Sequence, residues 1–247
     1  MILRTFIFFA ALTALVTAQD QSPVEPQSQP GLDQPVAAVE PSVKKIDENR
    51  YDIGGIIIDQ KLREIRIPTK VNMPEGLLEF AIVHLHGKLH ETLLLTEVSP
   101  TNINLAFTLL RYPPSPELYA LPNNHGGESN DYPEVSPEIK AAARIKIEVE
   151  WKDGENLKRF PINDWIQHTT TTLAMPPGPW VYGGSQIHHG KYSAEISGDI
   201  AAVFLSGSSI INYPGPDNRD DTVWVAFPNR VPPEGTDVTV IITPFSN

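Results

Sequence analysis

The segment from Arg144 to Trp151 constrains the fold more than any other part of this chain, because polar and apolar side chains alternate along its whole length. It reads RIKIEVEW, so an extended backbone places Ile, Ile, Val and Trp on one face and Arg, Lys, Glu and Glu on the other. This period of two is typical of a β-strand with one buried face. The segment therefore predicts a sheet that packs against a hydrophobic core.

Further strands are predicted wherever short runs of β-branched or aromatic residues stand between Gly, Asn and Pro residues. They cover residues 56–58, 64–68, 77–85, 180–182, 191–196, 201–205, 222–226 and 238–242. The alternating strand–helix pattern of a parallel sheet is missing from the sequence, and so is a glycine-rich nucleotide loop.

Helix signals are few. Ser99 is a suitable N-cap, Pro100 suits the first helical position, and apolar residues follow at helical spacing. A shorter helix is predicted over residues 163–168, and residues 122–137 are predicted to form an exposed loop. Together these patterns predict a mainly β (β-rich α+β) fold, an antiparallel sandwich or barrel-like sheet with one or two short helices packed on it.

The amino terminus has the pattern of an export signal. Arg4 precedes an apolar run from Phe6 to Val16, and small residues lead up to Ala18. This run is shorter than the ~20 apolar residues that a membrane-spanning helix needs. We therefore expect a signal peptide over residues 1–18 that is cleaved near Ala18, with an uncleaved anchor as the alternative. No later stretch is apolar enough to span a bilayer, so we expect an extracytoplasmic chain, periplasmic or secreted, without an integral span once the signal is removed.

Residues 19–43 have a different composition from the rest of the chain. They are rich in Pro, Gln, Ser and acidic residues and contain almost no large apolar side chains. Such a segment buries too little surface to offset the entropy of ordering it. We expect a disordered linker over residues 19–43, followed by a single strand-rich domain over residues 44–247.

The charge and the lack of cysteine exclude several classes of function. The chain carries 19 Lys and Arg against 30 Asp and Glu, which gives a formal net charge of −11. A nucleic-acid-binding protein needs basic surface, so we expect no nucleic-acid partner. Without cysteine there is no thiolate nucleophile, Fe–S cluster or disulfide.

Three of the seven histidines fall within the segment VHLHGKLHET, residues 83–92. Two backbone geometries are open for this segment. In a continuous strand, the period of two places His84, His86, Lys88 and His90 on one face. Neighbouring histidines on one face have a spacing that suits a shared metal ion.

The second geometry is a hairpin with Gly87 and Lys88 as its two-residue turn, where Gly in the first position suits a type II′ turn. We favour it because glycine weakens the middle of a strand. Cross-strand pairing would then bring His84, His86 and Glu91 to one face. Two histidines and a carboxylate can hold a divalent metal ion with open positions. The alternatives are a cluster of structural hydrogen bonds and a ligand or catalytic site without a metal.

Several segments resemble the YdjY-domain family of exported bacterial proteins, over most of the chain from about residue 44 to residue 244. The segments that carry this resemblance are YDIGG at Tyr51–Gly55, GKLHETLL at Gly87–Leu94, WVYGGS at Trp180–Ser185 and PPEGT at Pro232–Thr236. The resemblance implies an extracytoplasmic domain and no particular reaction. It also implies that Lys88, His90 and Glu91 are the ligand-binding residues. His84 and His86 lie outside the family motif.

The sequence contains no complete catalytic motif, so no catalytic residue is assigned. We expect a non-catalytic binding or structural module of the cell envelope, with an envelope protein or a cell-wall component as its partner. The alternative is a divalent-metal-dependent, hydrolase-like enzyme centred on His84, His86, His90 and Glu91.

Overall fold

The computed structural model of this chain describes residues 43–125 and 127–246. The predicted signal peptide, residues 1–18, and the predicted linker up to residue 42 lie outside the described residues. Val43 is the first residue of the first strand.

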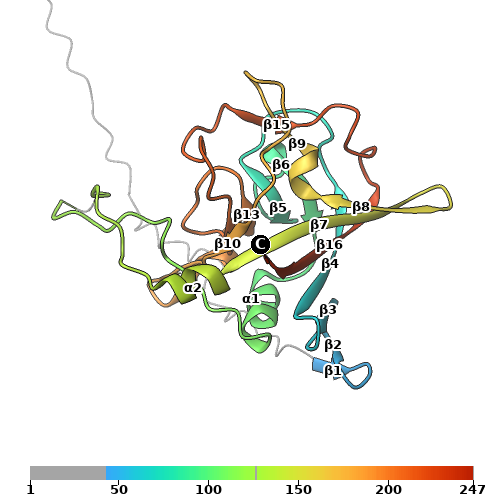
Figure 1. Cartoon of the computed structure of the whole chain (residues 1–247), viewed down its shortest axis with the longest axis horizontal. Coiled ribbons are helices and arrows are strands. Elements are labelled where there is room, and N and C mark those ends of the chain that lie inside the picture. Colours follow the sequence, from blue (N-terminus) through green and yellow to red (C-terminus); the bar gives the residue numbers. More distant parts are fainter. Residues whose placement is uncertain (1–42, 126, 247) are drawn as a thin grey trace, which may run out of the picture. The chain divides into compact units, whose positions relative to one another are not determined.

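Eight strands of the largest sheet close into a barrel (Figure 1). Their order around the barrel is β4, β16, β7, β10, β14, β13, β5 and β6, and the pairing of β4 with β6 closes the ring. The barrel strands are β4 (Glu64–Val71), β5 (Phe80–His84), β6 (Thr92–Thr96), β7 (Arg144–Asp153), β10 (Trp180–Tyr182), β13 (Asp199–Ala202), β14 (Ile211–Asn212) and β16 (Asp237–Pro244). The predicted β-rich, barrel-like fold is confirmed. Most neighbours are antiparallel, but β5 with β6 and β13 with β14 are parallel pairs.

Additional strands extend this sheet or form small pairs beside it. β1 (Val43–Lys45), β2 (Arg50–Ile53) and β3 (Ile56–Asp59) continue the sheet from β4, and β8 (Asn156–Pro161) pairs with β7. Two separate pairs are β9 (Ile166–His168) with β15 (Trp224–Ala226), and β11 (Ile187–His188) with β12 (Lys191–Tyr192). In Figure 1 the β7–β8 ribbon projects past the barrel.

Branched aliphatic side chains fill the inside of the barrel. Along β7, buried residues alternate with partly exposed ones from Arg144 to Trp151, as the sequence predicts. Two buried rows cross β4, β16 and β7 in register: Ile67, Val240 and Val149, and Ile65, Ile242 and Ile147. Burying each such side chain contributes roughly 1.5–3 kcal/mol. The barrel interior is therefore a packed core, and a ligand has to bind on its outside or at its ends.

The predicted helix at Ser99 is confirmed as α1 (Pro100–Leu109). The Ser99 hydroxyl oxygen accepts a hydrogen bond from the backbone N–H of Thr101 at 3.1 Å, which caps the helix. The buried face of α1 includes Ile103 and Phe107, which join the core. Within the described ranges, no helix has the length and apolar character needed to cross a membrane.

The shorter helices differ from the sequence predictions. They are α2 (Pro137–Ala142), α3 (Ser193–Ser197) and the 3₁₀ turns η1 (Leu89–Glu91) and η2 (Ile162–Trp165). The strand predicted over 191–196 ends at Tyr192, because the Ser185 hydroxyl accepts a hydrogen bond from the Ala194 N–H and helps to start α3. The helix predicted over 163–168 is a 3₁₀ turn followed by β9. Helix α2 was not predicted, although its Ser136–Pro137 start repeats that of α1.

Candidate functional site

The predicted site residues lie in and next to the connection between β5 and β6, residues 85–91. These two strands are parallel, and their register pairs Phe80 at the start of β5 with Thr92 at the start of β6. The connection therefore has to return along the whole length of β5. A two-residue hairpin joins antiparallel strands, so the predicted hairpin at Gly87 and Lys88 is wrong.

Parallel pairing also separates the residues that were predicted to bind a metal ion. His84 ends β5 and pairs with Thr96, whereas Glu91 directly precedes Thr92 at the other end of β6. Glu91 is therefore separated from His84 by about the length of β5, which is roughly 13 Å at the usual rise of a strand. The predicted site of His84, His86 and Glu91 is therefore not formed. In the part of the chain that the structure describes, no three His, Cys, Asp or Glu side chains are grouped so that they could hold a metal ion.

His84 and His86 are the two predicted ligands that do come together, with ring centroids 4.2 Å apart. The Nε2 atom of His84 lies 3.3 Å from the carbonyl oxygen of Glu97, and that of His86 lies 3.0 Å from the carbonyl oxygen of Glu195. A carbonyl oxygen only accepts, so each Nε2 is the donor. Burial, and then the neighbouring His86, lower the pKa of His84 below its ordinary value of 6.5.

Glu195 links this histidine pair to the start of α1. Its carboxylate accepts hydrogen bonds from the Ser99 hydroxyl and from the backbone N–H and hydroxyl of Thr101, each at 2.8 Å. Burial opposes the charge on Glu195, but these hydrogen bonds outweigh burial and hold its pKa below the ordinary 4.5. The β5–β6 connection, α3 and α1 thus meet at one corner, which we call the histidine corner and define by His84, His86 and Glu195.

Glycine is required where α3 meets the β5–β6 connection. Gly198 follows α3 with a φ of +80°, and a Cβ atom there would lie 2.9 Å from the backbone N and Cα atoms of Gly87. A Cβ atom on Gly87 would itself lie 3.0 Å from the Cβ atom of Val83. Gly87 therefore allows two segments to pack closely, and it does not serve as a hairpin glycine.

Lys88 directly precedes η1, His90 and Glu91 lie within it, and none of the three lines the wall pocket described below. The Lys88 Nζ atom forms an ion pair with Glu79 Oε2 at 2.6 Å, and the hydrogen bond with Glu79 raises the pKa of Lys88. The His90 side chain is 79% exposed, and its Nε2 atom lies 3.7 Å from Glu91 Oε2. The Asn72 side chain holds η1 in place by donating to the carbonyl oxygen of Leu89 at 2.6 Å. A ligand-binding role for Lys88, His90 and Glu91 stays a prediction.

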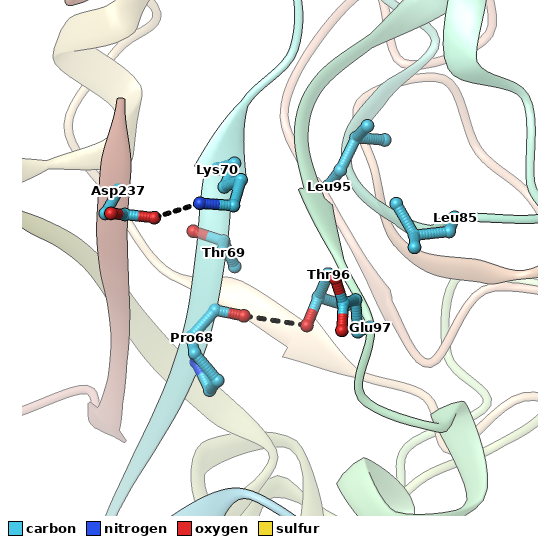
Figure 2. Close-up of a pocket in the computed structure, with 8 residues that line it drawn as sticks. All are labelled: Pro68, Thr69, Lys70, Leu85, Leu95, Thr96, Glu97 and Asp237. Atoms are coloured by element: carbon cyan, nitrogen blue, oxygen red, sulfur yellow. Dashed lines mark hydrogen bonds and ion pairs between the residues drawn. The ribbon is translucent and has the colours of Figure 1, made fainter. Parts of the chain in front are cut away.

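A small pocket opens in the barrel wall beside this connection (Figure 2). We call it the wall pocket; its volume is about 180 Å³, and its lining residues are Pro68, Thr69, Lys70, Leu85, Leu95, Thr96, Glu97 and Asp237. Figure 2 shows Leu85 and Leu95 on one side and the ion pair of Lys70 with Asp237 on the other. The Leu85 residue is 46% exposed.

The wall pocket exists because β4 changes its neighbour along one edge. It pairs with β3 through Arg66 and with β6 from Lys70 onward, so the residues between them have no strand beside them on that edge. Pro68 stands in this gap and has no N–H to leave unpaired. Its carbonyl oxygen accepts a hydrogen bond from the Thr96 hydroxyl at 2.7 Å. One side-chain hydrogen bond thus replaces the missing ladder pairing.

A second pocket lies beside the loop that joins the parallel strands β13 and β14. We call it the loop pocket; its volume is about 440 Å³, and its lining residues are Tyr119, Ala120, Glu128, Gln186, Phe204, Leu205, Gly207 and Arg219. It shares no lining residue with the wall pocket. Gln186 follows directly on the WVYGGS segment, and Gly207 lies within the serine-rich loop 206–209.

A partly buried hydrogen-bond network supports the serine-rich loop. Asp199 is 5% exposed, and its Oδ2 atom accepts a hydrogen bond from the Ser208 hydroxyl. The Ser206 and Ser208 hydroxyl oxygens lie 2.8 Å apart, and the Asn212 Oδ1 atom accepts from the Ser206 N–H at 2.9 Å. The other carboxylate oxygen of Asp199 is buried without a hydrogen-bond partner among the described residues. Such a group calls for a functional explanation or a bound water.

Sequence reasoning missed this network. The signal that could have revealed it is the run Ser206-Gly207-Ser208-Ser209 directly after an apolar strand, since clustered hydroxyls beside a glycine suit a polar site. The partner Asp199 lies at the other end of β13 from the loop, and only the folded chain identifies it.

Comparison with known proteins identifies the family of this chain. A family model described as the YdjY domain matches residues 56–243, a range that contains both pockets, the β5–β6 connection and the Asp199 network. Neither the curated proteins nor the solved structures include a significant match to the chain. The family model covers well over half of the sequence, and the chain therefore belongs to the YdjY domain family.

Proposed function

We propose that this chain is an exported, extracytoplasmic binding module that docks a partner protein of the cell envelope through the wall pocket and catalyses no reaction. The export signal predicted over residues 1–18 and the acidic charge of −11 support the location. The packed barrel interior supports binding on the outside of the barrel.

The observation that carries this proposal is the size and lining of the wall pocket. Small-molecule sites usually have volumes of about 300–1,000 Å³, and the wall pocket, at about 180 Å³, is smaller. A pocket of this size fits one aliphatic side chain between Leu85 and Leu95. Protein interfaces commonly combine such an apolar anchor with a polar rim.

The rim of the pocket indicates the chemistry of the partner. Lys70 and Asp237 neutralise each other in an ion pair. Glu97 is exposed and makes no ion pair within the described ranges. A complementary partner segment therefore presents an aliphatic side chain next to a basic one, which would face Glu97.

The geometry gives less support to the metal-dependent alternative. It requires at least three of His84, His86, His90 and Glu91 to converge, whereas the parallel pairing of β5 and β6 keeps Glu91 away from His84 and His86. His90 lies along η1 with Glu91 and is largely exposed. The binding proposal requires none of these residues as metal ligands.

Site-specific photo-crosslinking in the envelope of the producing cell tests the proposal. A photoreactive side chain at position 95 should give a discrete adduct with a single partner. Leu85→Asp should abolish the adduct, because a charge in the pocket opposes an aliphatic anchor. Leu173→Asp is the matched control, since Leu173 is 68% exposed and lies outside the pocket. Equal adduct yields in the Leu85→Asp variant and the unaltered chain would refute the proposal.

A further inference from the structure

We propose that the loop pocket is a second, independent binding site that takes a neutral saccharide unit. Its volume of about 440 Å³ lies within the range of small-molecule sites, unlike that of the wall pocket. Three features of its lining lead to this ligand class: the balance of charge, the free hydrogen-bonding groups, and the network behind the serine-rich loop.

The charges that line the loop pocket neutralise each other. An Nη1 atom of Arg219 lies 3.0 Å from Glu128 Oε2, and the Arg219 Nη2 atom donates to the Tyr132 hydroxyl at 3.2 Å. An anionic or cationic ligand would have to break this ion pair or remain without a counter-charge. The lining therefore favours a neutral ligand.

The uncharged polar groups of the lining can both donate and accept hydrogen bonds. The Tyr119 hydroxyl oxygen accepts from Asn212 Nδ2 at 2.8 Å, and its own proton has no acceptor among the described residues. Burial raises the pKa of Tyr119 to about 12, so this proton remains in place at neutral pH. The Gln186 amide is exposed and forms no side-chain hydrogen bond within the described ranges. Sugar hydroxyls also donate and accept, and Phe204 offers an apolar surface to the carbon side of a sugar ring.

The Asp199 network holds the serine-rich loop in place beside the pocket. The Ser208 hydroxyl donates to Asp199 Oδ2, so the Ser208 proton points to Asp199. Ser208 has no second proton, so the Ser206 hydroxyl must donate to it across the 2.8 Å contact. Gly207, which lines the pocket, lies between these two serines, so the network holds this part of the lining in place. A network with a fixed direction needs little reorganisation when a ligand binds.

Titration of the purified full chain with four sugars of similar size tests this proposal. The probes are glucose and N-acetylglucosamine, which are neutral, glucosamine, which is a cation, and glucuronate, which is an anion; binding is measured by calorimetry or by NMR shifts. At least one neutral sugar should bind saturably, and both charged sugars should bind at least about tenfold more weakly, which corresponds to about 1.4 kcal/mol. No saturable binding by either neutral sugar, or equal binding by a charged one, would overturn the proposal.

Matched variants locate the site and test the argument from charge. Gln186→Ala should weaken neutral-sugar binding about tenfold, whereas Ile187→Ala, next to it but outside the lining and 75% exposed, should not. Arg219→Gln leaves Glu128 unpaired and should shift preference towards glucosamine, and Glu128→Gln should shift it towards glucuronate. Unchanged preferences in both charge variants would contradict the inference.

Leu85→Asp should leave sugar binding intact. A failure of the sugar-binding proposal at the loop pocket can therefore be distinguished from a failure of the docking proposal at the wall pocket.

Discussion

The wall pocket and the loop pocket belong to one barrel but arise in opposite ways. The wall pocket forms where backbone pairing stops, between the part of β4 that pairs with β3 and the part that pairs with β6. The loop pocket forms where side chains hold an irregular loop in place, through Asp199 and two serines. The same closed barrel thus carries a small notch lined by Leu85 and Leu95 and a larger cavity with more polar lining.

The two pockets also differ in how exposed their aspartate side chains are. At the wall pocket, the side chains of Lys70 and Asp237 are 58% and 85% exposed, and such surface pairs contribute little to stability. Behind the loop pocket, Asp199 is buried and hydrogen-bonded, so removing it leaves another polar group without a partner. Two aspartates of one barrel should therefore respond very differently to the same substitution.

The largest expected effect comes from comparing these two aspartates. Asp199→Ala should lower the free energy of unfolding by about 2–3 kcal/mol, because the partly buried Ser208 hydroxyl loses its carboxylate acceptor. Asp237→Ala should change it by less than about 1 kcal/mol. Urea denaturation of both variants measures the difference. Equal losses in the two variants would contradict the contrast between a buried and an exposed carboxylate.

A smaller effect is expected at the gap in the barrel wall. Thr96→Val keeps the shape of the side chain but removes the donor to Pro68 and the acceptor for the Val98 N–H. We expect a loss of about 1–2 kcal/mol in the free energy of unfolding. Thr239→Val is the control, since the Thr239 hydroxyl makes no hydrogen bond within the described ranges, and it should be nearly neutral. A neutral Thr96→Val would mean that the gap does not depend on this bond.

Acidification should loosen the histidine corner in two steps. The pKa of His84 is lowered below 6.5, so its contribution to stability is present above pH 6.5 and is lost as the pH falls from there through the folded pKa. The pKa of Glu195 is lowered below 4.5, so its contribution is lost only as the pH falls below that value. Melting temperatures from pH 7.5 to pH 3.5 should show both steps. His84→Asn should remove the first step and Glu195→Gln the second, whereas persistence of both steps in these variants would assign them to other groups.

The smallest effect is expected from the two substitutions that probe binding. Leu85→Asp and Gln186→Ala each alter an exposed part of a pocket rim, and each should change the free energy of unfolding by no more than about 0.5 kcal/mol. Urea denaturation checks this directly. A larger loss in either variant would mean that its effect on binding reflects damaged folding.

Local signals in the sequence predicted much of the fold. The alternation along β7 predicts a strand, because one polar residue stands between each buried residue and the next. The Ser99–Pro100 pair predicts the start of α1, because capping depends on residues within one helical turn. These features depend on neighbouring residues, so a single sequence contains them.

The rest depends on contacts between distant segments. Gly87 and Lys88 are residue types that suit a hairpin turn. In the folded barrel, however, β6 lies between β5 and β4 and runs parallel to β5. The site predicted at His84, His86 and Glu91 depended on that hairpin, and without the hairpin the three side chains do not converge. No local pattern in the sequence links Asp199 to Ser208, because only the folded chain brings them together. The loop pocket was therefore not predicted.

The most direct test of the proposed function is the yield of partner adduct from a photoreactive side chain at position 95, measured in parallel in the Leu85→Asp and Gln186→Ala variants. The expected result is loss of the adduct in Leu85→Asp and an unchanged yield in Gln186→Ala, because the two pockets share no lining residue. An adduct that survives Leu85→Asp would contradict docking at the wall pocket. An adduct lost in Gln186→Ala would contradict the independence of the two sites.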